Sequence, residues 1–154
     1  MLPSNLQKLL REFNVKGYAD PSKTYEDNSK QGKLLRLQID AYTYEDEFYG
    51  GEPYSGNETI WELANQSFGV CIGGKLQKGE DFGVLYSFLR AALAQGPSGN
   101  CVHRGPESYR EADLEYTNEC IGDITEFRQI ERIVSKGKEV YIAYFNGGII
   151  NQKS

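Results

Sequence analysis

The chain has 154 residues and carries 17 lysines and arginines against 22 aspartates and glutamates, for a formal charge of −5. This length suits one domain over residues 1–154, and the scattered basic residues argue against a direct nucleic-acid partner, because phosphate binding needs clustered positive charge. Apolar runs are too short for a membrane-spanning helix and residues 1–13 lack a signal-peptide pattern, so we expect a cytoplasmic protein with no membrane partner.

Two segments show the apolar spacing of helices. Leu6, Leu9, Leu10 and Phe13 fall on one helical face and predict a helix over residues 6–13. Residues 20–33 are polar, contain a proline and a glycine, and predict a long surface loop. A second helix is predicted over residues 82–93, with a cap at residue 81 and a stop at the glycine–proline pair 96–97.

The remaining segments alternate apolar and polar residues, as strands with one buried face do. Residues 34–49 predict one long strand, whose polar face carries Asp40, Tyr42 and Tyr44. A glycine-rich turn then leads into predicted strands over residues 59–63 and 67–72. The second half of the chain predicts strands over residues 112–121, 124–134 and 139–145, separated by tight turns.

The order of these elements is helix, three strands, helix, three strands. We therefore expect an α+β fold in which two helices pack on a six-stranded, curved, mainly antiparallel sheet in the order α-β-β-β-α-β-β-β. Both "SFGVCIGG" and "YIAYFNGG" end a third strand on a glycine pair. An internal duplication and two unrelated halves both remain open.

The cysteines and the single histidine give no metal-binding or redox pattern. Cys71, Cys101 and Cys120 are odd in number and far apart, so we expect reduced, mostly packed thiols. His103 cannot form a multi-histidine site by itself. We expect no metal and no cofactor.

Tyrosine and glutamate dominate the candidate ligand-binding residues, and the chain has 11 tyrosines. A tyrosine suits the wall of a ligand cleft or a protein interface, although cross-strand aromatic pairs also stabilise sheets without binding anything. We expect Glu52, Glu58 and Trp61 to face a common cavity. The full set of candidates is Tyr42, Tyr44, Glu52, Tyr54, Glu58, Trp61, His103, Arg104, Glu131, Tyr141 and Tyr144.

Four stretches carry a resemblance to a known family: "AYTYEDEFYGGEPYSGNETIWE", "FLRAAL", "HRGPESY" and "FRQIERIVSKGKEVYIAYFNGG". Together they resemble the bacterial and archaeal domain-of-unknown-function family 5680, from the first helix to Gly148. The third strand departs from the family pattern, because Phe68 and Ile72 stand where the family usually has a tryptophan and a tyrosine. The resemblance implies a stand-alone domain of unassigned activity, and a sensor or dimerisation role in relatives that follow a helix-turn-helix segment.

Two functional hypotheses follow. In the first, the chain is a non-enzymatic module whose Tyr/Glu-rich sheet face binds a small molecule or a second copy of the chain as a homodimer. In the second, it is a small enzyme that uses Glu52, Glu58 or Glu131 for acid–base chemistry. The sequence leaves open whether any catalysis occurs.

Overall fold

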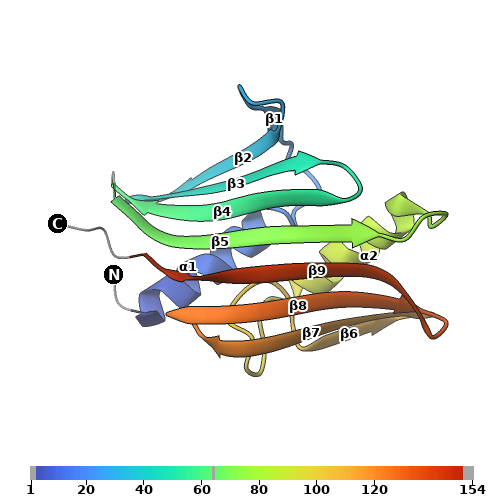
Figure 1. Cartoon of the computed structure of the whole chain (residues 1–154). Helices are drawn as coiled ribbons and strands as arrows, with labels where there is room; N and C mark the ends of the chain where they lie inside the picture. The colour runs from blue at the N-terminus through green and yellow to red at the C-terminus, as the bar shows by residue number, and fades with distance from the viewer. Residues whose placement is uncertain (1–2, 64, 151–154) are drawn as a thin grey trace.

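The computed structural model describes residues 3–63 and 65–150, and its main element is one large antiparallel sheet (Figure 1). Within those residues the sheet has nine strands in the order β1-β2-β3-β4-β5-β9-β8-β7-β6. Their bounds are β1 Glu26–Asp27, β2 Lys33–Ile39, β3 Tyr42–Gly50, β4 Tyr54–Glu62, β5 Asn65–Leu76, β6 Ser108–Glu111, β7 Leu114–Asp123, β8 Glu126–Ser135 and β9 Lys138–Ile149.

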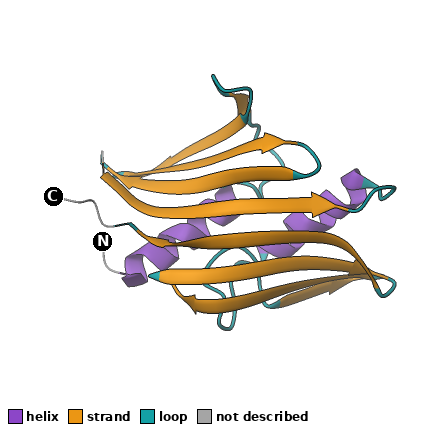
Figure 2. Ribbon diagram, in the orientation of Figure 1, coloured by secondary structure: helices purple, strands orange, loops and turns teal. Residues whose placement is uncertain are grey.

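Both described helices, α1 (Pro3–Lys16) and α2 (Phe82–Ala94), cover the same face of the sheet, as expected (Figure 2). At the start of α2, the side chain of Asp81 accepts a hydrogen bond from the backbone N–H of Val84 at 3.2 Å, which confirms the predicted cap. The ring of Phe13 on α1 stacks on Tyr44 of β3 with centroids 5.0 Å apart. Because Phe88 of α2 lies 5.5 Å from the ring of Tyr109 on β6, the helices contact both halves of the sheet.

The core lies between the helices and this inner face of the sheet. Its fully buried side chains include Leu6, Leu10, Phe13, Tyr44, Ile60, Phe68, Leu89, Tyr116, Ile133, Tyr141 and Phe145. Burial of large apolar side chains is the main favourable contribution to folding. In the part of the chain that the structure describes, no helix is long and apolar enough to cross a membrane.

The expected six-stranded sheet is wrong, and so is the expected order of elements. The predicted strand over residues 34–49 is two strands, β2 and β3, joined by a tight turn at Asp40 and Ala41. The predicted surface loop contains β1, and the connection after α2 contains β6. Short edge strands such as these carry too few residues for an alternating pattern to be visible.

The turn at Asp40 also changes which side chains face the core. Ile39 pairs directly with Tyr42, and Leu37 with Tyr44, so that these side chains lie on one face of the sheet. In one continuous strand, Tyr44 would have faced away from the leucines. Instead it is 2% exposed and belongs to the core, whereas Asp40 of the same predicted polar face is exposed.

The expectation of reduced thiols is also wrong for two of the cysteines. Cys101 and Cys120 form a disulfide that ties the connection after α2 to β7, with their Cα atoms 5.3 Å apart. Cys71 on β5 is a free, exposed thiol. The connection after α2 runs back beside β7, and this long-range proximity cannot be read from the spacing of the cysteines in the sequence.

Candidate functional site

A cavity of about 420 Å³ opens between α2, the segment that follows α1, and the inner face of β3–β5. Phe82, Tyr86 and Arg90 line it from one face of α2, because residues four apart lie above one another on a helix. The segment after α1 contributes Tyr18 and Tyr25. The other lining residues are Asp46, Phe48, Gly51, Glu52, Tyr54, Ile72 and Arg104.

Gly74 on the inner face of the sheet leaves room for the aromatic wall. A Cβ atom at Gly74 of β5 would lie 2.6 Å from the hydroxyl oxygen of Tyr54, so the ring of Tyr54 passes directly over this residue. The ring thereby reaches β9, where its hydroxyl shares a hydrogen bond of 2.9 Å with the hydroxyl of Tyr141. Any larger residue at position 74 would displace this wall of the cavity.

Arg104 lies at the inner end of the cavity and is held from several sides. Its Nε donates to Glu131 Oε1 at 3.0 Å, and its Nη1 lies 3.6 Å from Glu58 Oε1. Its guanidinium lies 4.8 Å from the ring centroid of Phe145 and 5.3 Å from that of Tyr18. This combination of ion pairs and ring contacts fixes the planar group in one orientation.

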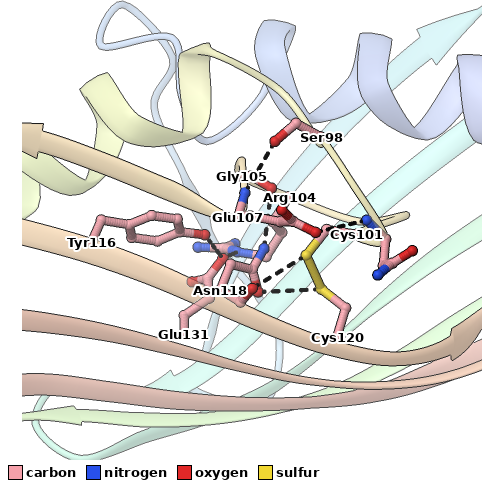
Figure 3. The surroundings of a disulfide bond; sticks show 10 residues. Ser98, Cys101, Arg104, Gly105, Glu107, Tyr116, Asn118, Cys120 and Glu131 are labelled. Atoms are coloured by element: carbon pink, nitrogen blue, oxygen red, sulfur yellow. Dashed lines mark hydrogen bonds and ion pairs between the residues drawn. A yellow bond between two sulfur atoms is a disulfide. The ribbon is translucent and has the colours of Figure 1, made fainter.

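Behind the cavity wall, Glu131 and Glu58 join a buried polar network. Glu131 also accepts a hydrogen bond of 2.9 Å from the hydroxyl of Tyr116, and Figure 3 shows Tyr116 and Arg104 both pointing toward it. Glu58 Oε2 lies 2.6 Å from Nε2 of His103, and both side chains are almost completely buried. Although burial raises the pKa of Glu58, the adjacent His103 and Arg104 lower it more, so this carboxylate stays ionised.

Asp46 is a carboxyl group of the cavity whose pKa is strongly raised. It lies on β3 directly opposite Glu58 on β4, and it accepts a hydrogen bond from the hydroxyl of Tyr25. Burial, together with the negative charge of Glu58, raises the pKa of Asp46 to about 7. At neutral pH this carboxyl group is therefore poised to hold or to release a proton.

Glu52 and Arg90 complete the polar lining in opposite ways. Both carboxylate oxygens of Glu52 are engaged, one by the hydroxyl of Tyr86 and the other by the backbone N–H of Leu76 at 2.6 Å. Arg90 lies 5.4 Å from the ring centroid of Tyr18 and, among the described residues, has no carboxylate within ion-pair distance.

The residues singled out in the sequence fall into three places. Glu52, Tyr54 and Arg104 line the cavity. Behind it lie the buried side chains of Tyr44, Glu58, His103, Glu131 and Tyr141. Three candidates lie away from the cavity: Tyr42, Trp61 and the half-exposed Tyr144. The hydroxyl of Tyr42, at the start of β3, donates to Glu62 at the end of β4, and the indole N–H of Trp61 donates to Thr59. Glu52, Glu58 and Trp61 therefore do not share one cavity.

Most of the aromatic wall was not identified from the sequence. Tyr18 and Tyr25 stand in or beside a segment predicted as surface loop, and Asp46, within the predicted strand over residues 34–49, was not among the candidates. A visible signal existed for Phe82, Tyr86 and Arg90, whose four-residue spacing puts them on one stripe of a predicted helix. That stripe is distinct from the one that packs into the core.

The family model described as Domain of unknown function (DUF5680) matches residues 46–150. The match begins within β3 and runs through α2 to the end of β9, so it includes Asp46, Arg90 and Arg104. It leaves out α1 and the segment that contributes Tyr18 and Tyr25 to the cavity. No curated protein and no solved structure matches the chain.

Proposed function

The chain belongs to the family described as Domain of unknown function (DUF5680), and from its cavity we propose a non-enzymatic protein that binds a small organic molecule. The observation that carries the proposal is the cavity itself. Its volume of about 420 Å³ falls in the range of small-molecule sites, roughly 300–1,000 Å³. A mostly aromatic wall with a few convergent polar groups is the usual composition of such sites.

The polar groups of the cavity support binding because they are already held in place without a ligand. Arg104 is fixed by Glu131, Asp46 accepts from Tyr25, and Glu52 accepts from Tyr86. A site whose side chains are ordered in advance loses less conformational entropy when a ligand binds. Flat tyrosine rings suit the faces of an aromatic or alicyclic ligand.

A small enzyme is the second candidate, and one observation favours it. Of the glutamates considered for acid–base chemistry, Glu58 and Glu131 are buried behind the wall, and Glu52 already accepts two hydrogen bonds. Asp46, by contrast, lines the cavity with its pKa raised to about 7. An enzyme built on this site would therefore use Asp46 as its acid or base.

The proposed binding is tested with the neutral fluorescent probe N-phenyl-1-naphthylamine and a variant that narrows the cavity. Gly51 lines the cavity and a Cβ atom there meets no atom within 4 Å, so position 51 has room for a larger side chain, and we expect Gly51→Trp to narrow the cavity. Gly73→Trp is the matched control, because a Cβ there lies 4.0 Å from its nearest neighbour and Gly73 does not line the cavity. We expect saturable binding to the wild type and to the control, and at least about tenfold weaker binding to Gly51→Trp. Equal binding to all three would contradict the proposal.

The homodimer expected from the tyrosine content stays a prediction. Tyr18, Tyr25, Tyr54 and Tyr86 line the cavity, so they leave less aromatic surface for an interface than the sequence suggested. The face of the sheet that the helices leave uncovered keeps Tyr144, which is 50% exposed. A second copy of the chain that binds through exposed tyrosine would use this face.

The cytoplasmic location belongs to the same proposal. The Cys101–Cys120 disulfide weighs against it, because disulfides persist mainly in oxidising compartments. Thiol labelling after acid quenching of cells tests the location. Labelling of all three cysteines supports the cytoplasm, whereas labelling of Cys71 without the other two supports an oxidising compartment.

A further inference from the structure

We infer that the ligand is an organic anion, an aromatic or alicyclic body with a carboxylate, phosphate or sulfonate group, and that Arg90 binds the anionic group. This inference rests on the proposed function, since it assigns the chemical class of the molecule in the same cavity. It follows from which charged groups of the cavity are already paired and which one is not.

Three of the four charged side chains that line the cavity have partners within the described residues. Arg104 is paired with Glu131 and lies close to Glu58. Both oxygens of Glu52 accept hydrogen bonds, and Asp46 accepts from Tyr25. The charge of Arg104 is thus balanced by carboxylates of the protein, and both oxygens of Glu52 are occupied, so these groups are less available than an unpaired arginine to balance the charge of a ligand.

Arg90 is the exception. Its guanidinium lies 5.4 Å from the ring centroid of Tyr18, and in residues 3–63 and 65–150 no carboxylate lies within ion-pair distance of it. Contact with a ring face leaves the N–H groups on the edge of a guanidinium free to donate. A carboxylate or phosphate can accept two of these hydrogen bonds at once, which makes arginine the preferred residue for such groups.

The position of Arg90 on α2 matches a ligand with both an apolar and an anionic part. Phe82 and Tyr86 precede it on the same helical stripe, so an aromatic body that contacts them places its anionic end one turn further along the helix. Arg104 also contacts Tyr18, with its guanidinium 5.3 Å from the centroid of that ring. Two guanidinium groups thus contact the same ring, but carboxylates of the protein balance the charge of Arg104, so Arg90 is the group that would attract an anion there.

Asp46 is compatible with an anionic ligand when it carries a proton. The groups that face it are Tyr25 from the segment before β1, Glu58 from β4, and Arg104 from the connection after α2, with Tyr44 on its own strand. Because its pKa is about 7, the carboxyl is largely neutral in mildly acidic solution and can donate a hydrogen bond. Above that pH its negative charge would repel the ligand.

The experiment compares two probes that share one aromatic body, 8-anilinonaphthalene-1-sulfonate and the neutral N-phenyl-1-naphthylamine. Their dissociation constants are measured by fluorescence for the wild type and for Arg90→Gln. Arg128→Gln is the matched control, because this exposed arginine on β8 lies outside the cavity and its replacement removes the same charge. We expect Arg90→Gln to weaken sulfonate binding about tenfold or more and to change binding of the neutral probe less than about twofold.

The outcomes separate the two proposals. If Gly51→Trp blocks both probes but Arg90→Gln weakens neither, or weakens both equally, the anion assignment is wrong and the binding function stands. Equal loss of sulfonate binding in Arg128→Gln would also overturn the assignment, because net charge would then explain the effect. If neither probe binds the wild type, or if Gly51→Trp changes binding of neither, the binding function fails and the anion assignment fails with it.

Discussion

Replacing Asp46 with asparagine is expected to remove a loss of stability that the wild-type chain suffers as the pH rises toward neutrality. Burial and the carboxylate of Glu58 raise the pKa of Asp46 from 3.8 to about 7. Between these values the unfolded chain releases the proton while the folded chain keeps it, so the free energy of unfolding falls as the pH rises. Because one pKa unit corresponds to about 1.4 kcal/mol, the loss reaches about 4 kcal/mol above pH 7.

Asparagine keeps an oxygen that can accept the hydrogen bond from Tyr25 but carries no charge. The stability advantage of Asp46→Asn over the wild type should therefore grow by about 3 kcal/mol between about pH 5 and pH 8. Urea denaturation at a series of pH values measures it. Glu58 changes the free energy of unfolding with pH in the opposite sense, since its pKa is lowered and the stability that it contributes is lost in acid. The quantity to compare is therefore the difference in the free energy of unfolding between Asp46→Asn and the wild type at each pH. Parallel pH profiles for the two proteins would refute the reasoning.

Three further predictions concern the core, the disulfide and the oligomeric state. Phe88→Ala should lower the free energy of unfolding by about 3 kcal/mol or more, because the ring is buried between α2 and β6. Val84 is exposed, so the control Val84→Ala should cost less than about 1 kcal/mol. Similar costs for the two variants would place Phe88 outside the core. Cys101→Ser should lower the free energy of unfolding by about 3 kcal/mol in non-reducing buffer, since the disulfide closes a loop with a separation of 19 residues. In a reductant that also opens the wild-type bond the same variant should cost little. Cys71→Ser is the control, and equal costs of Cys101→Ser in both buffers would argue against the bond. Light scattering at micromolar concentration should give twice the chain mass of 17.4 kDa if the chain is a homodimer, and a constant 17.4 kDa would contradict self-association.

Long, regular elements could be predicted from the sequence, and short or irregular ones could not. The helix after Asp81 has a cap, a buried stripe and a glycine stop, and the structure has it within one residue of the predicted end. The turn at Asp40 has only a weak signal, because a single aspartate is its turn-favouring residue and the apolar alternation continues up to it. Missing that turn merged two strands into one and reversed the face assigned to Tyr44.

The candidate site could be predicted only in part, for a related reason. Chemistry-bearing residues such as Glu52, Tyr54 and Arg104 were identified by their type, and these three line the cavity. Strand pairing puts Asp46 and Glu58 side by side on one face of the sheet, but only Asp46 lines the cavity, because Glu58 is covered by packing that the sequence does not reveal. Arg90 is the candidate for binding an anion because it has no ion-pair partner among the described residues, and the sequence alone does not show which arginines are unpaired.

The connection between α2 and β6 links the stability of the fold to the geometry of the site. It carries both His103 and Arg104, and Arg104 adopts a φ of 63°, a conformation that residues other than glycine rarely take. The disulfide of Cys101 fixes one end of this stretch to β7.

Asn118 of β7 fixes the other end of the stretch, since its side chain donates to the carbonyl oxygen of Gly105 at 3.1 Å and its backbone N–H to that of Glu107 at 2.9 Å. Arg104 is thus constrained by the chain on both sides as well as by Glu131. A guanidinium held so firmly acts as a fixed part of the cavity wall, which leaves ligand-dependent pairing to Arg90 on α2.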